Sequence, residues 1–332
     1  MNSLNSYTSP WWLPGGHLQT IWPALYAKRY SHAPAVWRRE RWTTPDQDFV
    51  DVDFCDTAKS TEVKPLLVLF HGLEGSSASH YAEAFADWAV QHQCDLAIPH
   101  FRGCSGTLNL APRAYHSGDH AEIDFFLRKF KQQADALRRP GIVAAGVSLG
   151  GNALMRWAGE HGVAAQQLVK AVASICSPLD LAASGKAIGE GFNRQVYTRM
   201  FLRSMKPKAL DKLKQHPGLF DAKRMLAAKD LYEFDNVFTA PLHGFQNTDD
   251  YWLRASALPV MSNIQIPALA LNALNDPFVP AVSLPTTHKV SPYVELWQPR
   301  HGGHVGFAKG ALPGHLKAMP TAVGAWLLQH LK

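Results

Sequence analysis

The chain has 332 residues, of which 46% are apolar and 18% charged, with a formal net charge of +6. This composition suits a globular protein with a substantial core, built as one large domain or two small ones. No stretch approaches the ~18 uninterrupted apolar residues of a membrane span, and the N-terminus lacks the basic start and apolar run of a secretory signal. We therefore expect a cytoplasmic protein without a membrane span.

The cysteines and histidines give no sign of a metal or redox site. The four cysteines (Cys55, Cys94, Cys104 and Cys176) match no metal-ligand or redox spacing. The sixteen histidines show no clustering of the H-E-x-x-H kind. We expect no metal and no organic cofactor.

The positive charge is concentrated in residues 186–229, which hold 11 Lys or Arg against three acidic residues, a local balance of +8. Such a patch can attract nucleic acid, anionic lipid or acidic substrates. Because no nucleic-acid motif accompanies it, we interpret it as a solvated helical face and expect no nucleic-acid partner. Peripheral contact with a membrane stays open.

The first segment of the chain, residues 1–35, shows no clear periodicity of apolar residues. We expect an irregular arm packed over the domain through its tryptophans, with His17 in a structural role. Alternation in residues 36–54 predicts a β-hairpin. Six apolar runs of strand length follow, separated first by helices of 12–20 residues, which indicates βαβ units and a parallel sheet. The six runs lie at 66–70, 96–99, 142–145, 170–176, 266–272 and 293–297.

The alternation of strands and helices is interrupted after Asp180. Residues 181–255 read as helical, near 193–205, 207–215 and 221–231, and show no convincing strand. An all-helical segment between two sheet strands predicts a cap over the carboxyl edge of the sheet. We therefore divide the chain into an arm (1–35), a core (36–180 and 256–332) and a helical cap (181–255), with a last helix over about 312–331. The aromatic and leucine residues of the cap could line a pocket or only pack it on the core (Phe192, Tyr197, Phe201, Leu202, Phe220, Phe234 and Phe238).

The stretch around Ser148 carries the first sign of chemistry. A strand ending at Ala145 leads into Gly146-Val147-Ser148-Leu149-Gly150 and then into an amphipathic helix. Strand, tight turn and helix, with a serine at the apex, is the context of a nucleophile elbow. The pentapeptide alone is a weak signal, since a chain of this length would contain it by chance roughly one time in ten. The serine could then be idle in a glycine-rich turn.

Two later loops supply the partners that such a serine needs. Asp276 follows the strand at 266–272, and His304 follows the strand at 293–297, so all three residues lie after strands, where parallel sheets bind ligands. A serine hydroxyl needs a base near neutral pH. We expect His304 to be that base and Asp276 to orient it, in the chain order of α/β-hydrolases. The backbone N–H groups of Leu73 and Leu149 are the expected oxyanion donors.

Several rivals for these roles stay open at the sequence level. His301 lies three residues before His304 and could be the base instead. Asp180 follows the strand at 170–176 and is the best substitute for the acid. Glu74, beside the expected oxyanion turn, is either a structural carboxylate or a substrate contact.

Seven strings of the sequence resemble a known family. The chain is similar to the bacterial YheT-type esterases of the α/β-hydrolase superfamily, which are related to eukaryotic α/β-hydrolase-domain lipases and to yeast medium-chain fatty acid ethyl ester synthases. The resemblance implies a serine hydrolase and places Ser148, Asp276 and His304 at the triad positions. Relatives often carry two acids before the proline at 277, whereas here Asn stands at 275. The strings are GGHLQT (15–20), FHGLEGSS (70–77), HFRGCSG (100–106), YHSGD (115–119), GVSLGGN (146–152), NDPFVP (275–280) and HGGHVGF (301–307).

From residues and resemblance together we expect an α/β-hydrolase fold: a mostly parallel eight-stranded sheet with helices on both faces and a helical cap. The expected activity is hydrolysis of a small-molecule carboxylic ester, with a short- to medium-chain acyl group, through an acyl-enzyme on Ser148. The alternatives are transfer of the acyl group to an alcohol and a non-catalytic binding protein on a hydrolase scaffold. The oligomeric state and the role of GGHLQT are left open.

Overall fold

The computed structural model describes residues 3–31, 33–55 and 63–331, so the arm predicted for 1–35 begins outside the described residues. Its centre is an eight-stranded sheet with strand order β1-β2-β4-β3-β5-β6-β7-β8. The hairpin β1–β2 is antiparallel, β2 pairs antiparallel with β4, and all later neighbours are parallel. The predicted fold class is confirmed. The strands are Arg38–Thr43, Phe49–Cys55, Leu66–Phe70, Asp95–Pro99, Ile142–Val147, Val172–Ile175, Ala268–Leu271 and Val294–Trp297.

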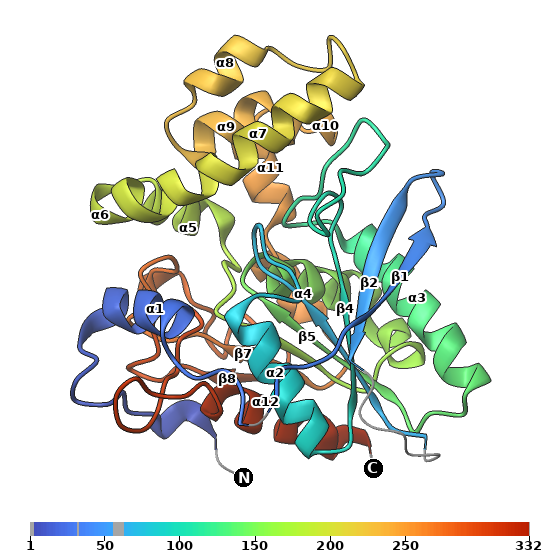
Figure 1. Ribbon diagram of the computed structural model, residues 1–332, viewed down its shortest axis with the longest axis vertical. Helices are drawn as coiled ribbons and strands as arrows, with labels where there is room; N and C mark the ends of the chain where they lie inside the picture. The colour runs from blue at the N-terminus through green and yellow to red at the C-terminus, as the bar shows by residue number, and fades with distance from the viewer. Residues whose placement is uncertain (1–2, 32, 56–62, 332) are drawn as a thin grey trace.

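Helices cover both faces of the sheet, because its buried strands are apolar on both sides (Figure 1). In β3, Val68 and Phe70 pack into the cluster that includes α3 and α4, whereas Leu67 and Leu69 pack into the cluster that includes α2 and α12. Alternate residues of one strand therefore serve two cores. The four helices are α2 His80–Gln91, α3 His120–Ala136, α4 Leu149–His161 and α12 Ala318–Leu328.

The side chain of Asp119 caps α3 by accepting from the Glu122 N–H at 3.2 Å, and the Glu122 carboxylate accepts a hydrogen bond from Arg102 instead of returning to the cap. One helix boundary differs from expectation. The last helix begins at Ala318 and not near residue 312. Pro313 and Gly314 precede it in a turn where Gly314 has φ +80°, which no helix accommodates.

The arm contains a helix that the sequence pattern does not reveal. Helix α1 spans Gly15–Leu25, where an irregular segment was expected. It begins with two glycines and contains Pro23. Both residue types disfavour helix, so local helix propensity does not predict α1. Trp12 and Trp22, which flank the start and the last turn of α1, do pack over the core with residues of α2 and of the C-terminal segment, as the aromatic content predicted.

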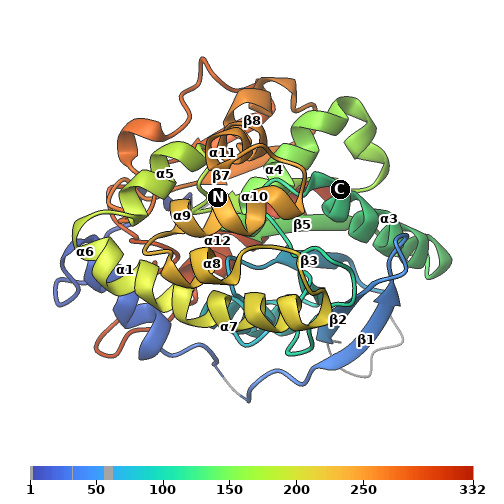
Figure 2. The same ribbon diagram turned by 90° about the horizontal axis from the view of Figure 1, so that it is seen from above.

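A purely helical segment, here called the insertion (residues 181–255), lies between β6 and β7. Figures 1 and 2 show its helices above the carboxyl edge of the sheet. All its residues are described, and none forms a strand. Helix α7 runs through Pro207, where a break was expected, because Leu202 and Ala209 are buried on either side of the proline. Its helices are α5 Leu181–Ile188, α6 Gly191–Asn193, the π-helix Arg194–Thr198, α7 Arg199–Gln215, α8 Ala222–Ala227, α9 Leu231–Val237, α10 Thr239–Leu242 and α11 Thr248–Ala255.

The division into an arm (1–35), a core (36–180 and 256–332) and a cap (181–255) stays a prediction. Within the described ranges, no helix is both long enough and apolar enough to cross a bilayer.

Candidate active site

Ser148 lies at the apex of a sharp turn between β5 and α4. Its backbone is strained, with φ 52° and ψ −118°, a conformation that few residues other than glycine adopt. A side chain at Gly146 would place its Cβ 2.5 Å from the Gly150 carbonyl oxygen, and one at Gly150 would lie 2.5 Å from the His71 carbonyl oxygen. Only glycine at these two positions lets strand and helix approach closely, as an exposed elbow requires.

The structure brings Ser148, His304 and Asp276 into one hydrogen-bonded chain. His304 Nε2 lies 3.1 Å from Ser148 Oγ, and His304 Nδ1 lies 2.9 Å from Asp276 Oδ2. The other carboxylate oxygen of Asp276 accepts from the backbone N–H groups of Phe278, at 2.8 Å, and Val279, at 3.3 Å. The Asp276 carboxylate is therefore oriented by its own loop, and a proton on His304 Nδ1 donated to it would leave Nε2 able to accept a proton from the serine.

The rival residues occupy other places. Asp180 caps α5 by accepting from the Ala183 N–H at 3.1 Å. Among the described residues, His301 makes no hydrogen bond or ion pair with any other. The geometry thus favours His304 and Asp276 over each rival.

Two backbone N–H groups near Ser148 have no hydrogen-bond acceptor among the described residues. Those of Leu73 and Leu149 donate to no other residue in the described part of the chain. In the turn after β3, the N–H groups of Gly72 and Glu74 both donate to tyrosine hydroxyls, at 2.8 and 2.9 Å, which leaves Leu73 as the free donor between them. Leu149 is the first residue of α4, at the positive end of its dipole. Both residues line the same pocket as Ser148.

Gln19 of α1 contacts the loops that carry Asp276 and His304, a role that sequence reasoning missed. Its Oε1 accepts from the Gly302 N–H at 2.8 Å and from Asn275 Nδ2 at 2.9 Å. Asn275 Oδ1 in turn accepts from the Gly303 N–H at 3.0 Å. Since Gln19 is 1% exposed, water cannot readily compete for the hydrogen bonds that its side chain makes.

Thr20 adds a direct contact to the residue expected to be the base. Its hydroxyl oxygen accepts from the His304 N–H at 2.9 Å and donates to the Gly16 carbonyl at 2.7 Å. A Cβ at Gly16 would lie 2.0 Å from the Asn275 carbonyl oxygen. The GGHLQT string is therefore the segment of α1 that packs against both loops, and its glycine pair beside polar residues was the available signal of such a close approach.

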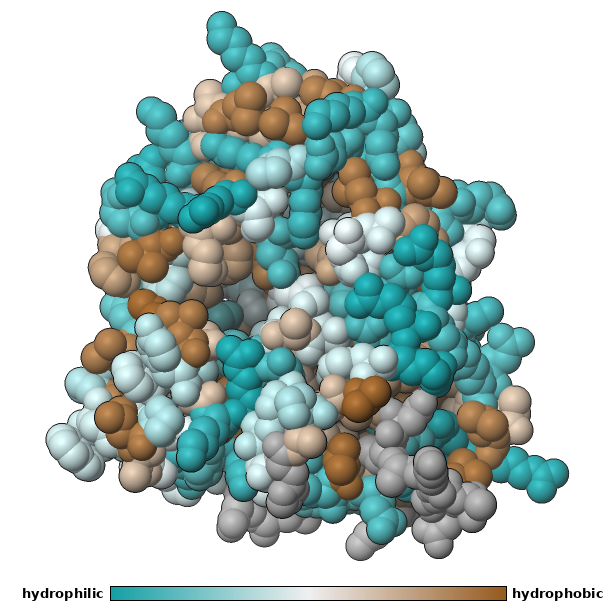
Figure 3. Space-filling view, in the orientation of Figure 1, coloured by the Kyte–Doolittle hydropathy of each residue, from teal (hydrophilic) through white to brown (hydrophobic). Residues whose placement is uncertain are grey.

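A pocket lies between Ser148 and the insertion, and Figure 3 shows the molecular surface hollowed between insertion and core. The core contributes Leu73, Ser148, Leu149 and His304. Of the cap residues considered from sequence, Phe201, Phe234 and Phe238 line the pocket, whereas the other four do not.

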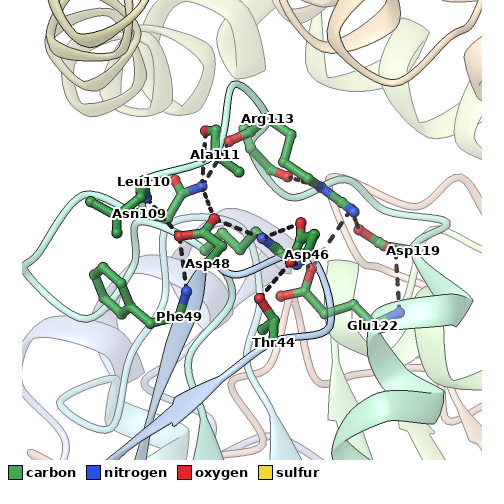
Figure 4. Close-up of polar contacts among 12 residues, drawn as sticks. Thr44, Asp46, Asp48, Phe49, Asn109, Leu110, Ala111, Arg113, Asp119 and Glu122 are labelled. Atoms are coloured by element: carbon green, nitrogen blue, oxygen red, sulfur yellow. Dashed lines mark hydrogen bonds and ion pairs between the residues drawn. The ribbon is translucent and has the colours of Figure 1, made fainter.

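The loop between β4 and α3 forms one wall of the pocket. A cluster of charged and polar side chains binds this loop to the β1–β2 hairpin (Figure 4). Arg102 donates to Asp48 Oδ2 at 2.7 Å and to Asp46 Oδ2 at 2.9 Å, and Asn109 Nδ2 also donates to Asp48, at 2.7 Å. Burial opposes ionisation of Asp48, but these hydrogen bonds and those from the Leu110 and Phe49 N–H groups outweigh it and lower its pKa to about 2.

Two lysines of α7 join the insertion to that wall and to the oxyanion turn. Lys208 Nζ lies 2.9 Å from Glu74 Oε2. Lys212 is buried and donates to the carbonyls of Asn109, at 2.6 Å, and Ala111, at 3.0 Å; burial lowers its pKa to about 8. Both lysines line the pocket. The basic segment is thus not wholly a solvated face, because part of it points inward.

Residues suited to metal binding are dispersed. Within the described ranges, no three His, Cys, Asp or Glu side chains are grouped so as to hold a metal ion. All four cysteines are buried, and none forms a disulfide within the described residues. Cys176 lies under the base loop, where its Sγ accepts from the Val305 N–H at 3.3 Å, and burial raises the pKa of its thiol well above the ordinary range.

Comparison with known proteins identifies the family of the chain. Residues 65–311 match the family described as alpha/beta hydrolase fold. The chain belongs to that family. It is 34% identical to "Putative esterase YheT" of Escherichia coli over 95% of this chain and 91% of that protein, and 26% identical to "Phospholipase ABHD3" of Homo sapiens over 92% and 74%. The solved structure of the esterase Pf2001 of Pyrococcus furiosus shares the fold, with a TM-score of 0.57 at 13% identity, over 92% of this chain and 99% of that one.

The predicted resemblance to YheT-type esterases is confirmed by these relatives, and so is the predicted enzyme class. This α/β-hydrolase is an esterase or lipase at the level of family, a carboxylic ester hydrolase.

Proposed function

We propose that the protein hydrolyses carboxylic esters through an acyl-enzyme formed on Ser148. The observation that carries this proposal is the chain of hydrogen bonds from Ser148 through His304 to Asp276, with distances of 3.1 and 2.9 Å, at the edge of a pocket. The strained turn presents the Ser148 hydroxyl to the pocket, and the Leu73 and Leu149 N–H groups could donate hydrogen bonds to an oxyanion formed there.

In the first half of the reaction, Ser148 Oγ attacks the carbonyl carbon of the ester while its proton passes to His304 Nε2. The carbonyl oxygen becomes an oxyanion and accepts hydrogen bonds from the Leu73 and Leu149 N–H groups. Asp276 stabilises the imidazolium through the His304 Nδ1 proton. Collapse of the intermediate breaks the bond to the alcohol oxygen, which takes the proton from His304 Nε2 and leaves.

In the second half, water attacks the carbonyl carbon of the acyl-enzyme and gives its proton to His304. The bond to Ser148 Oγ breaks, the serine recovers a proton from His304, and the carboxylic acid leaves. Each half uses the same donors and the same base, so one geometry serves both.

The size of the pocket favours a short- to medium-chain acyl group. Its cavity holds about 160 Å³, and a protein cavity of about 150 Å³ accommodates benzene, which corresponds to roughly six carbon atoms. The aromatic side chains Phe201, Phe234 and Phe238 would surround that group. We therefore propose small-molecule esters of butanoate or hexanoate length as substrates.

The test is a panel of p-nitrophenyl esters from acetate to hexadecanoate, assayed with wild type, Ser148→Ala and, as a matched control, the exposed Ser262→Ala. We expect Ser148→Ala to lower kcat by about 10⁴- to 10⁶-fold and Ser262→Ala to leave it unchanged. A fluorophosphonate should label wild type and Ser262→Ala only. Equal turnover by wild type and Ser148→Ala would refute the proposal.

A further inference from the structure

Glu74 directly follows Leu73, one of the two proposed oxyanion donors, and its backbone is strained. Its φ of +58° lies in the left-handed region, which is unfavourable for a residue with a Cβ atom. The Gly75 N–H donates to the Gly72 carbonyl at 2.9 Å, so residues 72–75 form a hydrogen-bonded turn with the positive φ at its third residue. Glycine is the usual residue at that position of such a turn. A glutamate retained there indicates that its side chain has a role.

The side chain of Glu74 closes a small ring of hydrogen bonds with Tyr115. The Glu74 N–H donates to the Tyr115 hydroxyl oxygen at 2.9 Å, and that hydroxyl donates to Glu74 Oε1 at 3.0 Å. The ring of Tyr115 stacks on Phe101, with centroids 5.7 Å apart. Burial raises the pKa of the Tyr115 hydroxyl well above its usual range, so the hydroxyl keeps the proton that it donates. One fixed tyrosine thus binds both the backbone and the side chain of Glu74.

The second carboxylate oxygen of Glu74 is also held by the protein. Oε2 is buried, and Lys208 Nζ of α7 lies 2.9 Å from it. With Tyr115 at one oxygen and Lys208 at the other, the carboxylate is turned toward its protein partners although Glu74 lines the pocket. Of the two alternatives that the sequence left open for Glu74, this arrangement favours the structural carboxylate over the substrate contact.

The turn also determines where the Leu73 N–H points. A peptide unit is planar, so the direction of the Leu73 N–H is tied to that of the Gly72 carbonyl in the same unit. Two groups hold this carbonyl: the Gly75 N–H at 2.9 Å and His71 Nδ1 at 2.8 Å. The first of these contacts depends on the backbone conformation of Glu74, which lies between Leu73 and Gly75. A relaxed Glu74 would therefore loosen the peptide that carries the oxyanion donor.

We propose that Glu74 is a positioning residue of the oxyanion site: bound to Tyr115, it keeps the turn in the conformation that directs the Leu73 N–H toward the oxyanion. This rests on the proposed esterase function and deepens it. In this role Glu74 neither contacts the substrate nor transfers a proton. Because the oxyanion exists only after Ser148 has attacked the ester, the contribution of Glu74 is expected in the transition state and not in substrate binding.

The experiment measures kcat and KM for p-nitrophenyl butanoate in variants of the two partners. Glu74→Ala and Tyr115→Phe should each lower kcat by about ten- to hundredfold with KM little changed, a smaller loss than the roughly 10²- to 10³-fold loss of a whole donor. Glu74→Gln keeps an oxygen that can accept from Tyr115 and should retain most of the rate. The matched control is Tyr232→Phe, because the Tyr232 hydroxyl donates to Asp249 at 2.9 Å within the insertion. It should behave as wild type.

A second measurement reports on the oxyanion directly. Ser148 Oγ adds to the carbonyl carbon of a trifluoromethyl ketone and forms a hemiketal whose oxyanion uses the same donors, so its inhibition constant should rise by the factor by which kcat/KM falls. Thermal midpoints check folding, and Glu74→Gly serves as a further variant. It removes the side chain without strain at a positive φ and should be as slow as Glu74→Ala.

Three results would overturn the role of Glu74. One is a wild-type rate in Glu74→Gly or Tyr115→Phe. Another is a raised KM with unchanged kcat in Glu74→Gln, which would make Glu74 a substrate contact. The third is equal affinity of all variants for the trifluoromethyl ketone. The esterase function is judged separately in each case, by whether Ser148→Ala abolishes the turnover that wild type shows.

Discussion

The core side and the insertion side of the pocket are held by different kinds of contact. On the core side, backbone N–H groups and buried side chains of α1 fix each reacting group, as in the 2.8 and 2.9 Å bonds that Gln19 Oε1 accepts. On the insertion side, the lining is largely apolar, and the polar contacts with the core, such as those of Lys208 with Glu74 and of Lys212 with the carbonyl of Asn109, involve none of Ser148, His304 and Asp276.

This difference corresponds to two tasks. Directional hydrogen bonds hold atoms to within fractions of an ångström, which proton transfer and attack require. Apolar packing is tolerant of shape, which suits a surface that selects an acyl group by size. Substitutions on the core side should therefore change kcat for every ester, whereas those on the insertion side should change the ranking of esters.

The largest effect is expected at the acid of the triad. Asp276→Asn should lower kcat by about 10⁴-fold, because an amide that accepts from the Phe278 N–H presents its nitrogen to His304 and disfavours the tautomer that the serine needs. Measurement on short and long p-nitrophenyl esters should give the same factor for each.

Asp180→Asn is the matched control, since Asp180 is the rival acid and an asparagine caps α5 equally well. It should retain wild-type kcat. A severe loss in Asp180→Asn with a mild one in Asp276→Asn would reverse the assignment of the acid.

A smaller effect is expected at Thr20, the positioning contact of α1. Thr20→Val keeps the shape but removes the acceptor of the His304 N–H, so we expect kcat to fall by about ten- to hundredfold with KM little changed, as for a displaced catalytic group. Thr20→Ser keeps the hydroxyl and should restore most of the rate. If Thr20→Ser is as slow as Thr20→Val while both have the thermal midpoint of wild type, the hydroxyl does not position His304.

The sequence predicted the placement of Ser148, Asp276 and His304 far better than the contacts that hold them. Strand runs and glycine turns are local signals, so Ser148, Asp276 and His304 could be placed after their strands, and the structure brings them together. The role of Gln19 depends on contacts some 280 residues away along the chain, which no local pattern encodes. Helix α1 was not predicted, because glycine and proline are poor helix formers. Nothing in the sequence distinguishes Asp235 from the other acids of the insertion.

The smallest expected effects concern stability against pH, where the two sides should have opposite signs. On the core side, burial opposes ionisation of Asp48, but the hydrogen bonds that it accepts lower its pKa from 3.8 to about 2. The stability that Asp48 contributes to the fold is therefore present above pH 3.8 and lost as the pH falls through 2. On the insertion side, burial raises the pKa of Asp235 of α9 from 3.8 to about 6, so the stability that it contributes is present below pH 3.8 and lost as the pH rises through 6. Thermal midpoints measured from pH 2 to 8 should show the acid slope flattened in Asp48→Asn and the slope between pH 4 and 6 flattened in Asp235→Asn, each by about 1–3 °C. If both variants flatten the same limb, the two acids do not differ in environment, and the contrast between a hydrogen-bonded core wall and an apolar insertion wall fails at these positions.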